Sequence, residues 1–232
     1  LSRGKYLDQL VSKGSWIGPF HGIPFALKDI FDLEGQITTS GCKLLENHVA
    51  KKSGTIVRRL CEAGGVVLGK SKTVEMAFGG WGTNQKMGTP KNPWDLSCLS
   101  ARVCGGSSSG SAAAVASDMA TCAVGSDTGG SVRIPAAFCG LTGLKVTEGR
   151  LPVDGITPLS KLLDTPGPIA RSVMDTAIMF SVMLGISGQE LNENIEKNSA
   201  IFSFLGKSPK NLTLGVLEDS EREKCDPEML EM

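Results

Sequence analysis

Histidine is scarce in this chain, with two residues among 232, and aromatic residues make up only 5%. His21 and His48 lie in no motif that would place either beside a serine or a cysteine, so we do not expect a histidine-activated nucleophile. Cysteine and histidine do not occur at zinc-ligand spacing either. We therefore expect a core built mainly from aliphatic side chains, with no metal and no other cofactor.

Net charge is also lacking, because 24 Lys and Arg residues balance 24 Asp and Glu residues. A neutral chain has no bulk electrostatic reason to bind nucleic acid or an anionic membrane surface. No apolar run approaches the roughly 18 residues of a membrane-spanning helix, and no secretory signal opens the sequence. We expect no membrane segment and a cytoplasmic location.

The seven cysteines form no C-x-x-C pair, and their number is odd. Several lie inside apolar runs, as Cys122 and Cys139 do. These features favour free, buried thiols in a reducing compartment over a disulfide framework.

Helix and strand patterns alternate in the first half of the chain. Residues 55–63 have apolar side chains at helical spacing, Gly64 and Gly65 end that helix, and residues 66–68 predict a short buried strand. This order is typical of an α/β unit with a parallel sheet. Residues 64–71 also match the phosphate-loop pattern G-x-x-x-x-G-K-S. A helix precedes the first glycine, however, and Val-Val-Leu favours a strand, so we do not expect nucleotide binding.

The other expected elements follow from the same kinds of pattern. Helices are expected over 1–14 and 71–79, from an N-cap at Ser109 or Ser111 to about 116, from Pro135 onward, and over 170–185. A buried strand or strand end is expected in the apolar run over 23–31, a strand over 121–124, a strand or turn over 141–146, and a strand over 212–217. Glycine, proline and polar residues predict loops over 80–100, 147–169 and 186–210.

Two glycine- and serine-rich clusters, residues 105–111 and 125–131, enclose an alanine-rich helix candidate. Glycine lets backbone N–H groups approach a ligand closely, and serine hydroxyls on tight turns are candidate nucleophiles. Lys28 lies in an apolar run over 23–31. A buried lysine there would have a lowered pKa and would serve as the base that histidine does not supply. An exposed strand lysine is the alternative at this point.

Three motifs resemble those of the amidase signature family. They are GPFHGIPFALKD at 18–29, CGGSSSGSAAAVA at 104–116 and GSDTGGSVRIPAAFCGLTGLKVTEGR at 125–150. Segments 53–77 and 163–177 are similar as well, so the resemblance covers about residues 15–190. It implies an α/β fold in which helices cover both faces of a mixed, mostly parallel central sheet. It also implies an amidohydrolase acting on linear amides, at C–N bonds other than peptide bonds.

The catalytic device of that family is a Ser–cis-Ser–Lys triad. Carried over by motif, Ser131 is the nucleophile, Ser107 is the bridging serine after a cis peptide bond, and Lys28 is the base. The resemblance implies an oxyanion hole formed by the backbone N–H groups of Thr128, Gly129, Gly130 and Ser131.

Three further residues are expected to support this triad. Asp127 and Arg133 flank the nucleophile and are expected to tie its loop down. Ser108 is expected to form a hydrogen bond near Lys28.

The resemblance treats residues 1–232 as the N-terminal part of a single domain, with the signature core at about 53–177. Family members are about twice this length. We therefore expect a truncated chain that lacks residues upstream and a second half that completes the substrate pocket.

Three functions stay open from the sequence. The first is hydrolysis of a small-molecule amide through an acyl-enzyme on Ser131, for which the resemblance also allows a homodimer. The second is a glutaminase-type A subunit of a tRNA-dependent amidotransferase, the one case in which we expect a link to nucleic acid. The third is an inactive fragment with a structural role, which the intact Lys28, Ser107 and Ser131 disfavour.

Overall fold

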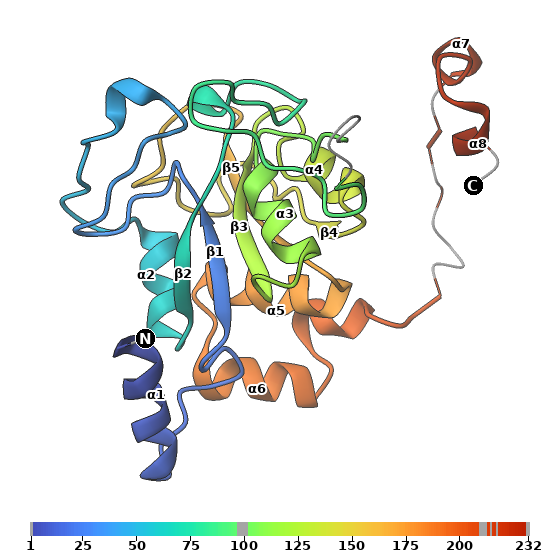
Figure 1. The fold of residues 1–232 in the computed structure, drawn as a ribbon. Helices are drawn as coiled ribbons and strands as arrows, with labels where there is room; N and C mark the ends of the chain where they lie inside the picture. The colour runs from blue at the N-terminus through green and yellow to red at the C-terminus, as the bar shows by residue number, and fades with distance from the viewer. Residues whose placement is uncertain (1, 97–101, 209–212, 214, 217, 231–232) are drawn as a thin grey trace.

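A five-stranded sheet forms the centre of the molecule, seen in a computed structural model that describes residues 2–96, 102–208, 213, 215–216 and 218–230 (Figure 1). The strands lie in the order β2-β1-β3-β5-β4. Their bounds are Pro24–Lys28 (β1), Val66–Ser71 (β2), Cys122–Asp127 (β3), Thr142–Gly143 (β4) and Thr165–Ala170 (β5). β1 runs parallel to β2 and β3, whereas β5 runs antiparallel to β3 and β4. The sheet is therefore mixed, as predicted.

Helices cover both faces of this sheet (Figure 1). α3 (Ser109–Ala116) and α4 (Arg133–Phe138) lie on one face, and α2 (Thr55–Glu62) and α5 (Val173–Leu184) lie on the other. Side-chain alternation along β1 explains the two layers, since Phe25 and Leu27 join the larger core and Ala26 joins a smaller core with Val115 of α3. The predicted α/β fold is confirmed.

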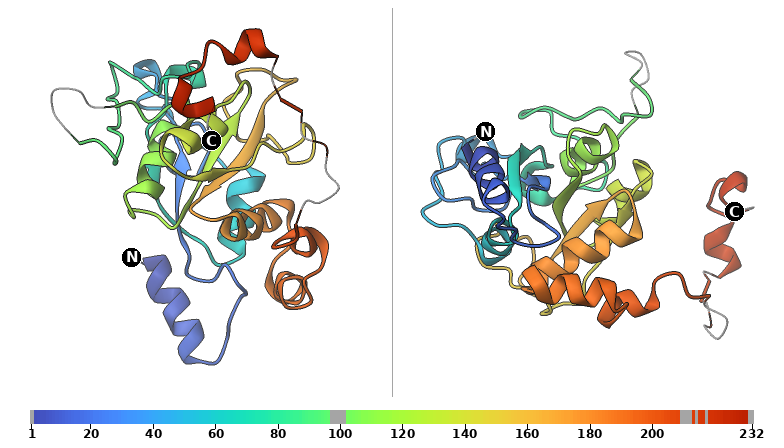
Figure 2. Two further views of the ribbon diagram at one scale, coloured as in Figure 1. Left: turned by 90° about the vertical axis from the view of Figure 1, so that its right-hand side faces the viewer. Right: turned by 90° about the horizontal axis from the view of Figure 1, so that it is seen from below.

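The remaining helices lie around this centre. α1 (Ser2–Ser12) and α6 (Gly188–Glu196) lie below the sheet in Figure 1. α7 (Asp219–Arg222) and α8 (Pro227–Leu230) lie away from the sheet, as Figure 1 and the right-hand view of Figure 2 show. Short 3-10 helices span Lys43–Leu45, Glu75–Ala77 and Ala200–Phe204. No helix in the described ranges is both long and apolar enough to cross a membrane.

β5 corrects the prediction of a loop over 147–169. Pro166 and Pro168 argue locally against a strand, yet β5 is buried along its whole length and pairs with β3 from Thr165 to Ala170. The Pro168 carbonyl accepts a hydrogen bond from Leu144, so the side of β5 on which the prolines lack N–H groups faces β4. The β4 ladder is only two residues long. The N–H groups that Pro166 and Pro168 lack are therefore missing on the side of β4, and the hydrogen bonds between β5 and β3 are unaffected.

Two other predictions were wrong in part. Residues 66–71 form strand β2, as a strand was predicted there, and this disfavours a phosphate-binding loop at 64–71. The strand was predicted to be buried, but it lies at the edge of the described sheet, and Leu68 is 54% exposed. Residues 186–210 are not simply irregular, because α6 and the following 3-10 helix bury Leu191 and Phe202 in the core. Residues 212, 214 and 217 of the strand expected over 212–217 lie outside the described residues.

The start of α3 also differs from the prediction. Ser108 is the N-cap residue, Ser109 opens the helix and Ser111 lies inside it. The Ser111 hydroxyl donates to the Val124 carbonyl (3.1 Å) instead of capping the helix. The helix expected over 71–79 shrinks to the 3-10 turn Glu75–Ala77, because β2 continues to Ser71.

Candidate active site

Lys28 ends β1 in the interior of the molecule. Its side chain is 0% exposed, so the alternative of an exposed strand lysine is wrong. Its Nζ lies 2.8 Å from the Ser107 Oγ and 2.8 Å from the Ser126 Oγ. The structure thus brings together two of the three predicted triad residues, which lie 79 positions apart in the sequence.

Burial sets the protonation of this lysine. Loss of solvent lowers the pKa of Lys28 from 10.5 to about 7, although the negative charges of Asp127 and Asp164 act in the opposite direction. A substantial fraction of the amine is therefore neutral near pH 7, which is the form that accepts a proton.

Ser107 follows a cis peptide bond with Gly106, as the resemblance implies. The Gly106 N–H donates to the Gly80 carbonyl (2.7 Å), and the Ser107 carbonyl accepts from the Thr73 hydroxyl (3.0 Å). A Cβ on Gly106 would lie 2.6 Å from the backbone nitrogen of Gly82, so only glycine fits there. This close packing fixes the backbone that presents the Ser107 hydroxyl to Lys28.

Ser131 lies on the loop between β3 and α4 and is partly exposed. Its carbonyl accepts from the Ser108 N–H (3.3 Å), which holds this loop against the segment that carries Ser107. Its hydroxyl has no hydrogen-bond partner among the residues that the structure describes. Ser131 is thus the partly exposed member of the predicted triad, and the other two are buried.

Asp127 binds several groups of the loop that carries Ser131. Its buried carboxylate accepts from the N–H groups of Gly130 (2.8 Å) and Val132 (3.1 Å) and from both the Nε (3.0 Å) and a terminal nitrogen (3.1 Å) of Arg133. Burial alone would raise the pKa of Asp127, but the hydrogen bonds from Arg133 and the backbone outweigh it and hold the pKa below its usual value. This geometry supports the expectation that Asp127 and Arg133 tie the loop down.

The four backbone N–H groups expected to form an oxyanion hole are not equivalent. That of Gly130 already donates to Asp127. Those of Thr128, Gly129 and Ser131 have no acceptor among the described residues. A Cβ on Gly129 would meet nothing within 4 Å, so space is open beside this part of the loop.

Ser126 was not recognised in the sequence, although it contacts Lys28 directly. Ser108, which was predicted to form a hydrogen bond near Lys28, bonds to the backbone of Ser126: its hydroxyl donates to the Ser126 carbonyl and accepts from the Ser126 N–H, both at 3.3 Å. The sequence offered no local signal for it, because Ser126 falls in the glycine- and serine-rich cluster at 125–131 and becomes part of a buried strand only in the structure.

Neither histidine belongs to this site. The Nδ1 of His21 accepts from the Ile17 N–H (3.2 Å), and its Nε2 lies 3.3 Å from the Leu7 carbonyl of α1. His48 is exposed on the loop between β1 and α2. The described residues contain no group of three or more His, Cys, Asp or Glu side chains that would hold a metal ion.

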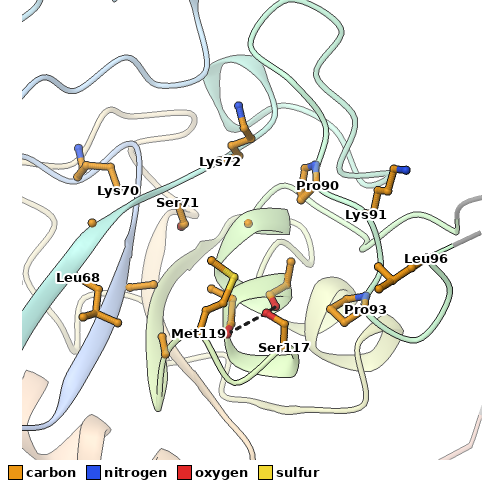
Figure 3. A pocket seen from close by; sticks show the side chains of 16 residues that line it. Leu68, Lys70, Ser71, Lys72, Pro90, Lys91, Pro93, Leu96, Ser117 and Met119 are labelled. Carbon is orange, nitrogen blue, oxygen red and sulfur yellow. Dashed lines mark hydrogen bonds between the residues drawn. The ribbon is translucent and has the colours of Figure 1, made fainter. Parts of the chain in front are cut away.

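An apolar groove of about 500 Å³ lies elsewhere, between β2, α3 and the loop around Pro90 (Figure 3). Leu68 lines one side, Pro93 and Leu96 line the other, and Met119 lies between them. Lys28, Ser107 and Ser131 do not line it. The groove is therefore separate from the candidate active site.

Known proteins share this arrangement of sequence and fold. The family model described as Amidase matches residues 1–232. The chain belongs to the amidase signature family. This amidase chain is 39% identical over 232 residues to the A subunit of the glutamyl-tRNA(Gln) amidotransferase from Persephonella marina, covering 100% of the chain and 47% of that protein.

Solved structures agree with this membership. The native peptide amidase of Stenotrophomonas maltophilia superposes with a TM-score of 0.73 at 36% identity, covering 90% of the amidase chain and 41% of that structure. The A subunit of the glutamyl-tRNA(Gln) amidotransferase from Thermotoga maritima gives 0.66 at 43% identity, covering 72% and 36%. The chain therefore spans less than half the length of these relatives.

Proposed function

We propose that this chain carries the catalytic machinery of an amidase that hydrolyses a carboxamide C–N bond through an acyl-enzyme on Ser131. The observation that carries the proposal is the buried Lys28, whose amine lies 2.8 Å from the hydroxyl of Ser107. Family membership supports the reaction class. The roles of the individual residues rest on their geometry and on motif resemblance.

In the proposed mechanism the neutral amine of Lys28 accepts a proton from Ser107 while Ser107 takes the proton of Ser131. The Ser126 hydroxyl accepts one N–H of the amine, which leaves the nitrogen lone pair for Ser107. The Ser131 oxygen then attacks the amide carbonyl. Reversal of the relay protonates the leaving amine, and water resolves the acyl-enzyme.

The developing oxyanion needs donors in a fixed position. We assign this role to the N–H groups of Thr128, Gly129 and Ser131, which have no acceptor among the described residues. The Gly130 N–H joins them only if it leaves Asp127. Each oxyanion donor is worth about 2.7–4 kcal/mol in the transition state.

A second function is favoured by the names of the curated relatives. The first two of these, from Persephonella marina and Carboxydothermus hydrogenoformans, are glutamyl-tRNA(Gln) amidotransferase A subunits. A glutaminase-type A subunit would use the same residues on glutamine and pass the ammonia to a partner. Ammonia release from glutamine only in the presence of a partner protein would favour this function, whereas turnover of small amides by the chain alone would favour the amidase.

The third possibility left open by the sequence is an inactive chain with a structural role, which the intact Lys28, Ser107 and Ser131 disfavour. The chain spans 47% of the Persephonella marina protein. Absence of both turnover and active-site labelling in the wild-type chain would support it.

The nucleophile is tested by labelling with a serine-directed fluorophosphonate. Ser131→Ala is expected to abolish both labelling and amide turnover, because no other serine is assigned the attacking role. Ser117→Ala is the matched control, since Ser117 is exposed at the end of α3 and should retain both. Unchanged labelling in Ser131→Ala would refute the assignment. A panel of small amides, glutamine and fatty amides then separates the substrate classes.

A further inference from the structure

Two buried cysteines flank the segments that carry Ser107 and Ser131. Cys104 lies three residues before Ser107, and Cys139 directly follows α4, the helix after Ser131. Both side chains are buried, and they share a small apolar cluster with Ala112 of α3. The two cysteines therefore lie close together, one on each of the two segments that carry the candidate catalytic serines.

Independent contacts hold the two cysteines together. The Cys139 thiol donates to the Cys104 carbonyl (3.6 Å), and the Cys104 thiol donates to the Pro90 carbonyl (3.5 Å). The side-chain nitrogen of Asn92 donates to the carbonyls of Val103 (3.1 Å) and Phe138 (2.9 Å), the residues directly before the two cysteines. The backbones on both sides of the pair are thus joined by one amide group.

The two thiols differ in acidity. The neighbouring side chain of Cys139 lowers the pKa of Cys104, although burial acts against it. The same contact and burial both raise the pKa of Cys139. Because the thiolate is the nucleophile in thiol oxidation, Cys104 is suited to attack and Cys139 to resolve. Cys122 offers a contrast, since burial raises its pKa to about 12.

We propose that Cys104 and Cys139 form a disulfide when the protein meets a hydroperoxide, tying the segment before Ser107 to the helix after Ser131. The Cys104 sulfur attacks the O–O bond, which gives a sulfenic acid and releases an alcohol, or water from hydrogen peroxide. The Cys139 sulfur then attacks the sulfenic sulfur, loses its proton and displaces the hydroxyl as water. Two electrons pass from the two thiols to the peroxide.

Peptide mapping tests the bond directly. After hydrogen peroxide treatment and alkylation of free thiols, cleavage after Arg102, Arg133 and Lys145 separates peptide 103–133 from peptide 134–145. The expected product is these two peptides joined, with the link lost on reduction. Cys122 shares the first peptide with Cys104, so additional cleavage before Asp118 assigns the linked sulfur. Two free thiols, or a link from either cysteine to Cys98 in peptide 92–102, would overturn the proposal.

Variants provide the control. Cys139→Ala should abolish the link, whereas Cys61→Ala should retain it, because Cys61 lies on α2 across the sheet. The oxidised wild type should also melt a few degrees above the reduced protein, since the bond restricts the unfolded chain. An equal shift in Cys139→Ala would count against the assignment even where mapping is ambiguous.

The consequence for turnover rests on the proposed function. Drawing Cys104 toward Cys139 displaces the backbone close to Ser107, and misplacement by about 1 Å costs about 100-fold in rate. Oxidation should therefore reduce turnover at least tenfold, and dithiothreitol should restore it. Full turnover in the cross-linked protein would refute this regulation. Absence of turnover in the reduced protein would instead refute the proposed function and leave the mapping result standing.

Discussion

Lys28 makes the proposed chemistry dependent on pH. Only the neutral amine accepts a proton, and burial lowers its pKa to about 7. We expect kcat/KM to rise with pH through this value and then level off, and Lys28→Ala to lose orders of magnitude at neutral pH. Rates measured over about pH 5 to 9 check both expectations.

Lys197→Ala is a suitable control for this experiment. Lys197 is exposed and forms an ion pair with Glu193, so its removal should leave the pH profile of turnover unchanged. A wild-type profile that is flat around pH 7, or a Lys28→Ala rate within a few-fold of wild type, would exclude Lys28 as the base.

Asp127 is expected to stabilise the Ser131 loop through its acceptor bonds. Asp127→Ala leaves the Gly130 and Val132 N–H groups without their acceptor, while Arg133, 54% exposed, stays solvated. We expect the free energy of unfolding to fall by about 2–4 kcal/mol, as measured by urea denaturation. Asp118→Asn, which removes the charge of an exposed pair with Arg171 and keeps a residue type that tolerates the left-handed backbone there, should cost less than about 1 kcal/mol. Equal losses in the two variants would contradict this account of the loop.

At this scale the sequence motifs predicted Lys28 and Ser107 correctly as neighbours, because the family pattern places both. They did not predict Ser126. Its contact with Lys28 arises where the ends of two parallel strands meet, and strand pairing lies beyond any local motif.

Packing between two loops fixes the element that presents Ser107. Gly106→Ala would place a Cβ 2.6 Å from the nitrogen of Gly82 and 2.7 Å from the carbonyl of Gly79, both backbone atoms that have little room to move. We expect a loss of about 1–3 kcal/mol in stability together with loss of fluorophosphonate labelling at Ser131.

Gly129→Ala is the matched control, because its Cβ would meet nothing within 4 Å and its backbone is not left-handed. It should fold with wild-type stability. A similar loss of stability in both variants would show that close packing at Gly106 is not the cause.

Elements were predictable where one local pattern decides them. α2 and α5 follow from helical spacing and an N-cap or glycine end, and β1 and β3 from short apolar runs. β5 was missed because its prolines are tolerated only where their missing N–H groups face β4, which pairs with β5 over two residues. The sequence of β5 alone does not show which neighbour lies on that side. α6 was missed because it buries few apolar residues, with Leu191 as its buried contact.

The free energy of unfolding should depend on pH because of the lowered pKa of Lys28. The unfolded chain holds this group at a pKa near 10.5, and the folded protein holds it at about 7. Between these pH values the unfolded chain binds a proton that the folded protein has released, so the free energy of unfolding rises with pH. Lys28→Met removes this contribution.

The measurement compares urea denaturation of wild type and Lys28→Met at about pH 7 and pH 9. The stability of wild type relative to the variant should rise by about 2 kcal/mol over this range, since one pKa unit is worth about 1.4 kcal/mol. Lys197→Met serves as the control for a lysine in solvent. Parallel pH dependences in all three proteins would contradict the burial of a lysine with a lowered pKa.

The fold class was predictable at the scale of the molecule because alternating helix and strand patterns and the family motifs agree. The exposure of the sheet edge at β2 was not predictable. β2 reads locally as a buried strand, but whether a strand is buried depends on what lies beside it, and in the described residues one side of β2 has no partner.

The 79 positions between Lys28 and Ser107 have a practical consequence. A segment of the chain that lacks either Lys28 or Ser107 cannot form the proposed site, so the site requires long-range folding of the chain. Covalent labelling of Ser131 would then report native sheet assembly molecule by molecule. Folding and unfolding of this chain could be followed by counting labelled molecules, without any substrate.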